Sequence, residues 1–166
     1  IPMSMAAVLL PEFDQEMAST RRVLERVPDG NPDWKPHPKS FSLAHLAQLL
    51  ARMPGWIGQT LTSTELELGT GGGYSNQPTT SLLETFDENV RRAREAIAAS
   101  TDAEYDVPWS LKVHGHVAFT LPRRAVVRQH MGHLSHHRGQ MTVYLRLLDV
   151  PVPSVYGPTA DESWQG

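Results

Sequence analysis

The sequence predicts an all-α protein, a four-helix bundle with long irregular connections. Apolar residues recur at helical spacing in four separate stretches, and segments rich in proline or glycine lie between them. The length of 166 residues suits one domain, which we place over residues 1–166. A chain of this length buries a substantial core without disulfides.

The first helix is predicted over residues 3–27. Apolar and charged residues follow one another there at helical spacing, and Pro28 marks the end of the pattern. The next stretch, PDGNPDWKPHPKS, holds four prolines in thirteen residues. Each proline removes a backbone donor and biases the preceding residue toward extended backbone, so we expect a long loop.

A second helix is predicted from Ser40, its N-cap, to about Leu61, with a kink at Pro54 and Gly55. The stretch GTGGGYSNQP follows it. Its glycines are compatible with a phosphate-binding loop, but no Lys-Ser/Thr pair follows and no strand is predicted before it. We therefore interpret this stretch as a plain connector.

The third helix is predicted in TTSLLETFDENVRRAREAIAAS, where Ser81 and Glu84 have the spacing of a capping box. Residues 101–120 mix aromatic and β-branched residues with proline and glycine, which indicates an irregular or briefly extended crossover. The last helix is predicted from just after Pro122 to about Leu148.

Composition excludes several classes of function. The chain has 15 Lys+Arg against 18 Asp+Glu, a formal charge of -3 with no basic run, so nucleic acid is not expected as a partner. It has no cysteine, so any metal must be bound by His, Asp or Glu. It has no run of 18 apolar residues, so no membrane contact is expected, and the apolar start lacks a basic leader. A cytoplasmic location is the simplest interpretation.

Four of the eight histidines lie in the stretch HMGHLSHHRGQ, residues 130–140 of the last helix. At about 100° per residue, with His133 at zero, His137 falls at about 40°, His130 at about 60° and His136 at about -60°. The first three share one face, and apolar residues continue that face along the helix. We therefore expect these three histidines to point into the bundle.

The spacing of His133 and His137 lets two imidazoles on adjacent turns bind one metal ion, and His45 in FSLAHLAQLL is the visible third ligand. Three histidines that leave one position open make a catalytic type of metal site. The alternative is that these histidines are packed in the core or an interface and hydrogen-bond to one another. A zinc-protease motif is excluded because Leu134 stands where HExxH has Glu, and Ser135 lacks the GxSxG context of a nucleophile.

Several stretches carry a resemblance to a known family. They are LLPEFDQEM, WKPHPKSFSL, LAQLLARMPGW and, most specifically, HHRGQMTVYLRLLDVPVPSVYGPTADE. The chain resembles the DinB (damage-inducible) family, also grouped with YfiT-like metalloenzymes, over almost its whole length. The resemblance implies a four-helix bundle, often a homodimer, with nickel, zinc or iron held by three histidines. It also implies a small-molecule substrate and, in characterised relatives, thiol-dependent transfer or isomerisation with a small thiol such as bacillithiol or mycothiol.

By this resemblance, His133 and His137 match the two ligands on the last helix. The branch pattern SLGRLAxHxAxxPGW places the remaining ligand at Leu49 and an arginine at His45, so the chain departs from the family there. The preferred hypothesis is a metal-dependent S-transferase or hydrolase with His45, His133 and His137 as ligands. The rival is a catalytically silent bundle that binds a small molecule or dimerises, with an incomplete metal site.

Other expectations concern the surroundings of this site. His130 and His136 are the candidate catalytic residues, as proton shuttles or as partners of a ligand, with core packing as the alternative for His130. We expect Arg138 to pair with Asp161 or Glu162. The long first and last helices offer more apolar surface than a small bundle hides, which predicts a homodimer.

Overall fold

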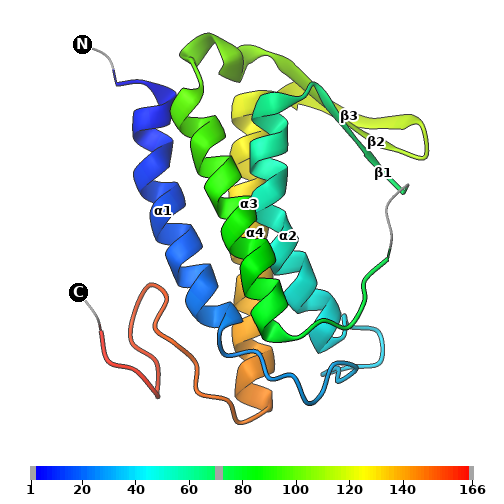
Figure 1. The fold of residues 1–166 in the computed structure, drawn as a ribbon, viewed down its shortest axis with the longest axis vertical. Helices are drawn as coiled ribbons and strands as arrows, with labels where there is room; N and C mark the ends of the chain where they lie inside the picture. The colour runs from blue at the N-terminus through cyan, green and yellow to red at the C-terminus, as the bar shows by residue number, and fades with distance from the viewer. Residues whose placement is uncertain (1–2, 70–72, 165–166) are drawn as a thin grey trace.

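The computed structural model describes residues 3–69 and 73–164 of the chain. Four long helices form the bundle, as predicted (Figure 1). They are α1 (Met5–Leu24), α2 (Leu43–Thr62), α3 (Thr79–Ala99) and α4 (Arg123–Leu147). Within the described residues, no helix is both long enough and apolar enough to cross a membrane.

Polar side chains fix where three of these helices begin. The Ser4 hydroxyl accepts from the amide of Ala7 at the start of α1, and the Ser42 hydroxyl accepts from the amide of His45 at the start of α2. The N-cap of α2 is therefore Ser42 and not Ser40, because Ser42 directly precedes the first helical turn. At α3, the amide of Thr79 donates to the carboxylate of Asp29, 2.7 Å away.

The capping box predicted at Ser81 and Glu84 is wrong. Helix α3 begins at Thr79, so both residues already lie within it, and its N-cap position is Pro78 without a side-chain cap. The long-range bond from Asp29 takes the place of a local cap. Of the glycine-rich connector, residues 70–72 lie outside the described residues.

Helix α2 packs mainly against α3 and α4 and supplies much of the core of the bundle. Its fully buried side chains include Leu46, Leu50, Met53 and Ile57. The helix continues through Pro54. At Gly58, an added Cβ would come within 3.2 Å of the Ala93 Cα of α3, so the missing side chain lets the two helices approach closely.

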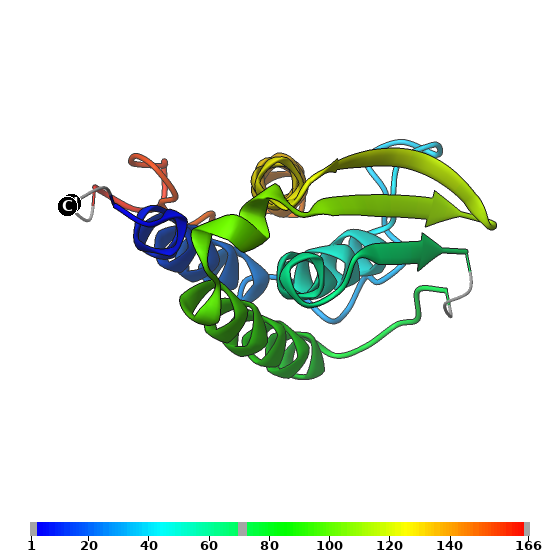
Figure 2. The ribbon, with the colours of Figure 1, turned by 90° about the horizontal axis from the view of Figure 1, so that it is seen from above.

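A three-stranded sheet is the main addition to the predicted all-helical fold. The crossover predicted at residues 101–120 contains a short 3-10 helix (Asp102–Asp106), strand β2 (Pro108–Val113) and most of strand β3 (His116–Pro122). β2 pairs antiparallel with β3 and parallel with β1 (Glu65–Leu68). The sheet extends sideways from one end of the bundle, on the side of α2 and α4 and away from α1 (Figures 1 and 2).

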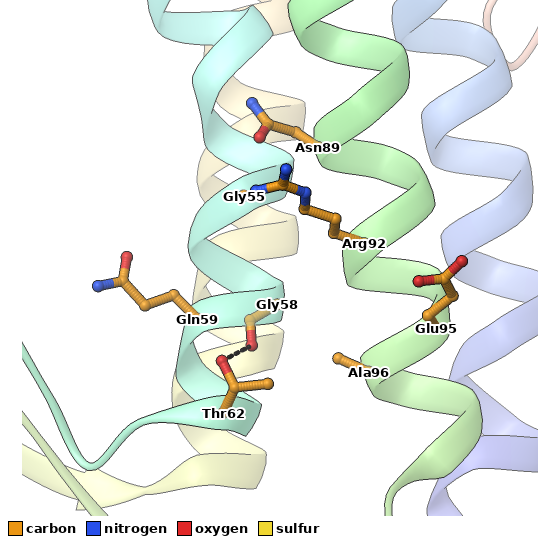
Figure 3. A pocket seen from close by; sticks show the side chains of 8 residues that line it. All are labelled: Gly55, Gly58, Gln59, Thr62, Asn89, Arg92, Glu95 and Ala96. Atoms are coloured by element: carbon orange, nitrogen blue, oxygen red, sulfur yellow. Dashed lines mark hydrogen bonds between the residues drawn. The ribbon is translucent and has the colours of Figure 1, made fainter.

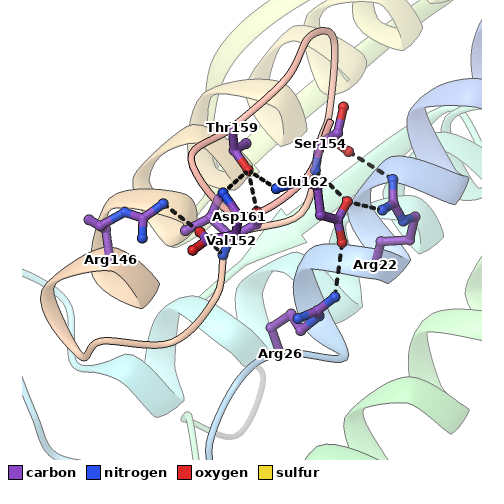
Figure 4. A network of polar contacts seen from close by, with 8 residues as sticks. All are labelled: Arg22, Arg26, Arg146, Val152, Ser154, Thr159, Asp161 and Glu162. Atoms are coloured by element: carbon purple, nitrogen blue, oxygen red, sulfur yellow. Dashed lines mark hydrogen bonds and ion pairs between the residues drawn. The ribbon is translucent and has the colours of Figure 1, made fainter. Parts of the chain in front are cut away.

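The C-terminal segment after α4 is tied to α1 and α4 by charged side chains (Figure 4). Asp161 pairs with Arg146, and Glu162 pairs with Arg22 and Arg26. Both carboxylates also accept from backbone amides of the segment itself. These contacts hold the C-terminal segment against α4 and the C-terminal end of α1.

Arg138 does not pair with Asp161 or Glu162, so that expectation is wrong. It is only 2% exposed and forms an ion pair of 2.7 Å with Glu16 of α1. It also donates to the hydroxyl of Tyr156, 2.6 Å away, and Tyr156 in turn bonds to Glu16. The reason is position: Arg138 faces α1 inside the bundle, whereas the two acidic residues lie over the ends of α1 and α4.

A candidate binding cleft beside the histidine pair

A row of aromatic and imidazole rings follows the faces of α2 and α4 that lie beside the sheet. Adjacent members have ring centroids between 3.6 and 6.3 Å apart. In spatial order the ring row consists of Phe119, Trp109, His130, Trp56, His133, His137, Phe41, His45 and Tyr74. His45 of α2 and three histidines of α4, His130, His133 and His137, thus belong to one row of ring contacts.

His133 and His137 form a hydrogen-bonded pair at the middle of the ring row. Their Nε2 atoms are 2.9 Å apart, and Nδ1 of His137 lies 2.7 Å from Oε1 of Gln140. Because an amide oxygen only accepts, Nδ1 of His137 carries the proton. Nε2 of a neutral His137 is then the acceptor, and Nε2 of His133 donates to it.

The environment keeps both rings of the pair neutral to lower pH than usual. Burial lowers the pKa of His137, and it lowers the pKa of His133 with further help from the positive charges of His137 and His136. The side chain of His137 is buried, whereas that of His133 is exposed. His133 is therefore the member of the pair that a small molecule can reach.

His45 lies between two aromatic rings near the N-terminal end of α2. Its ring stacks on Phe41 at 4.2 Å and on Tyr74 at 3.6 Å. The hydroxyl of Tyr144 donates to the Phe41 carbonyl, 3.0 Å away, which fixes one side of this stack. Burial lowers the pKa of His45, followed by the positive charge of His137. His45 therefore belongs to the same row of rings as the pair and is linked to His137 through Phe41.

His130 packs between two tryptophans at the other end of the ring row. Its centroid is 5.9 Å from that of Trp56 and 6.2 Å from that of Trp109, whose ring stands at 88° to it. Its Nε2 is buried and has no hydrogen-bond partner among the described residues. Burial, followed by the charge of His133, lowers its pKa to about 4. These contacts favour core packing for His130. His136 is exposed, with its ring 4.9 Å from that of His137.

An apolar cavity of about 170 Å³ opens beside His133. The sheet covers it, because side chains of all three strands reach across to α2 and α4. Its apolar walls are formed by Trp56, Leu66, Leu68, Leu111 and Phe119. His130, His133 and Gln129 of α4 supply its polar side chains, and no carboxylate of the described part of the chain lines it.

Comparison with known protein families matches residues 3–165 to the DinB family. The chain belongs to the DinB family. Among solved structures, a DinB-like protein from Bacillus cereus ATCC 10987 is similar with a TM-score of 0.66 and 21% identity, covering 94% of this chain and 100% of that one. The DinB-like protein YjoA of Bacillus subtilis has a TM-score of 0.69 at 14% identity, covering 94% and 99%.

Similarity to a curated sequence is confined to a short stretch. The uncharacterized protein YrdA of Bacillus subtilis (strain 168) is 43% identical over 44 residues, which span 26% of this chain and 26% of that protein. At their level of identity, the two solved DinB-like structures show the shared fold alone.

Within the described residues, His133 and His137 are not joined by a third metal ligand in the present arrangement of side chains. His133 and His137 converge, but the described residues contain no group of three His, Asp or Glu placed to hold a metal ion. The position that the family resemblance assigns to the remaining ligand is Leu49, a buried residue without a donor atom. The ring of His45 is held in the stack with Phe41 and Tyr74. The ligand set His45, His133 and His137 stays a prediction.

Several members of this DinB cleft were not identified from the sequence. Phe41 stands four residues before His45, so the spacing of a stacked pair was present in the sequence, although Phe41 precedes the helix itself. Tyr74 had no comparable signal. It reaches His45 because the Ser75 amide donates to Oε1 of Gln48, which ties the connector to α2. The cavity walls from the sheet depended on strand pairing.

A wider groove of about 540 Å³ lies between α2 and α3 (Figure 3). Its lining includes the small residues Gly55, Gly58 and Ala96, and no histidine of residues 3–69 and 73–164 lines it. Its charged residues Arg92 and Glu95 are bound by neighbours on α3. The combination of apolar walls and imidazoles occurs in the cleft beside the sheet, which we therefore take as the candidate site.

Proposed function

We propose that this chain is a small-molecule-binding protein of the DinB family, whose ligand occupies the apolar cavity beside His133. The observation that carries the proposal is the cavity itself, with apolar walls from α2 and the sheet and imidazoles along α4. Binding sites for small molecules are typically apolar clefts with a few placed polar groups. A cavity of about 150 Å³ holds one benzene ring, so this one accommodates a ligand group of that size.

The histidine pair also supports binding without a metal. His137 has both ring nitrogens engaged, by Gln140 and by His133. His133 is exposed and lines the cavity, so its remaining nitrogen, Nδ1, is free to bond to a ligand there. We infer that the pair orients His133 toward the ligand, with His137 as a positioning residue.

Binding of benzyl alcohol, followed by ligand-observed NMR, tests this proposal. Leu68 lines the cavity and is 40% exposed, so Leu68→Trp should fill the cavity with little risk to the fold. We expect this variant to weaken binding at least about tenfold, a loss of about 1.4 kcal/mol. Leu121→Trp is the matched control, because Leu121 is 37% exposed and does not line the cavity. Equal binding by the wild type and Leu68→Trp would contradict the proposal.

A second candidate function is the metal-dependent enzyme that the resemblance implies, a thiol-dependent S-transferase or a hydrolase with a divalent metal. The observation that favours it is the convergence of the Nε2 atoms of His133 and His137 at 2.9 Å. Such a site requires a third donor, from His45 or from a bound molecule such as a small thiol. The cavity would then accommodate the apolar part of the substrate.

Titration of Zn²⁺ and Ni²⁺ into untagged protein separates the two functions. The metal-dependent candidate predicts one equivalent of tightly bound metal in the wild type, and its loss in His137→Ala. Leu49→His should then raise the affinity at least about tenfold, because it restores a third imidazole at the position of the family ligand. No tight binding in the wild type, or full binding in both His133→Ala and His137→Ala, argues against this candidate.

A further inference from the structure

Arg52 differs from the other arginines of the protein. The chain has twelve, and within the described residues ten of them form ion pairs with carboxylates. Arg123 donates instead to the carbonyl of Ser63, 2.7 Å away. Arg52 has no carboxylate within 4.0 Å among the described residues. An arginine without an acidic partner in a protein of net charge -3 is available to an external anion.

The position of Arg52 relates it to the candidate cleft. At about 100° per residue, Arg52 and Trp56 fall within about 40° of each other on α2, on the face that also carries His45. Its guanidinium lies 5.0 Å from the centroid of Tyr74, the last member of the ring row. The guanidinium of Arg52 therefore places a positive charge at the Tyr74 end of the ring row.

The apolar cavity and Arg52 differ in chemistry but are neighbours along α2. Trp56 lines the apolar cavity and Arg52 lies one helical turn before it, a rise of about 6 Å along α2. Among the residues that the structure describes, no acidic side chain lines the cavity, so none of them repels an anion there. A guanidinium presents a planar fork of donors that matches both oxygens of a carboxylate.

We propose that the ligand of this cleft is an amphipathic monocarboxylate, whose apolar ring or chain fills the cavity beside Trp56 and whose carboxylate binds Arg52. This inference rests on the proposed function, since it assigns the ligand class to the same cavity. The separation of one helical turn fits a linker of two or three bonds between the apolar group and the carboxylate.

The test compares 3-phenylpropanoate with 3-phenylpropanamide, which has the same shape without the charge. For the wild type at low salt, we expect the acid to bind about ten times more tightly than the amide, because its bonds to Arg52 are charge-assisted. Arg52→Gln should abolish this preference and leave the affinity for the amide unchanged. Raising the salt concentration should weaken binding of the acid alone.

Arg92→Gln is the matched control, because Arg92 is an exposed arginine on α3 in the groove of Figure 3, away from the cleft. It should keep the tenfold preference. If Arg52→Gln loses its fold, Arg52→Lys serves instead and should retain part of the preference for the acid, since it keeps the charge without the fork.

The outcomes separate this inference from the proposed function. Equal binding of acid and amide by the wild type, with both weakened by Leu68→Trp, would overturn the carboxylate inference and leave small-molecule binding intact. A preference for the acid that survives in Arg52→Gln would likewise remove Arg52 from the site. Binding of neither compound, together with no binding of benzyl alcohol, would overturn the proposed function itself.

Discussion

The three histidines of α4 in the ring row differ in chemistry although they lie on neighbouring turns of one helix. His133 is exposed along the cavity, His137 is buried with both nitrogens bonded, and His130 is packed between Trp56 and Trp109. Helical periodicity placed all three on one face. It did not distinguish among them, because burial and hydrogen bonding depend on which residues of α2 and the sheet each ring meets.

His130 should make the stability of the protein dependent on pH. Its pKa is about 4 in the folded chain and about 6.5 when it is solvated, so between these values the unfolded chain binds more protons. The free energy of unfolding should therefore fall as the pH drops from 6.5 toward 4. Protonation of His130 accounts for up to about 3 kcal/mol of this fall. Above pH 6.5 the ring is neutral in both states and causes no loss of stability.

Urea denaturation at pH 7 and pH 4.5 measures this dependence. In His130→Phe, which keeps a ring between the tryptophans but cannot be protonated, the difference between the two pH values should be smaller by about 2 kcal/mol. The remaining dependence comes from other groups, including His45, His133 and His137, whose pKa values are lowered chiefly by burial. An unchanged difference in His130→Phe would show that His130 is not a buried neutral ring.

At the scale of elements, the sequence predicted the helices and not the sheet. Apolar spacing placed all four helices because each buries one side against the others. Strands β2 and β3 are short, and β2 also pairs with β1, whose residues lie about 45 positions earlier. No local pattern reveals such a pairing. The same limit applied to the site: the histidine pair followed from spacing on α4, whereas the cavity required the sheet.

One ion pair between α1 and α4, Glu16 with Arg138, is largely buried. Glu16→Gln removes the carboxylate that compensates Arg138, which is 2% exposed, and so leaves a buried cation without a counter-charge. We expect a loss of about 2 to 3 kcal/mol in the free energy of unfolding, measured in urea. Glu12→Gln is the matched control on the same helix, because its pair with Arg128 is exposed, and it should cost less than about 1 kcal/mol. Equal losses in both variants would mean that burial does not strengthen the pair.

At the scale of the whole molecule, the bundle hides its core but leaves apolar side chains on the outside of α4. Val143 and Leu147 lie one turn apart there and are 57% and 56% exposed. The candidate cleft lies elsewhere, beside the sheet, so a partner on this face would leave the cavity open. This arrangement supports the prediction of a homodimer, which we propose forms through the outer face of α4.

Light scattering tests the dimer directly and should give twice the mass of the chain. Val143→Glu should shift the protein to monomer, because it would place two related carboxylates in an apolar contact. Val117→Glu is the matched control, because Val117 is 56% exposed and lies on β3 of the sheet, not on α4. This variant should leave the mass unchanged. A monomer throughout the micromolar range would contradict the dimer. A dimer that persists in Val143→Glu would move the interface away from α4, because a buried charge on both copies costs more than a single apolar contact contributes.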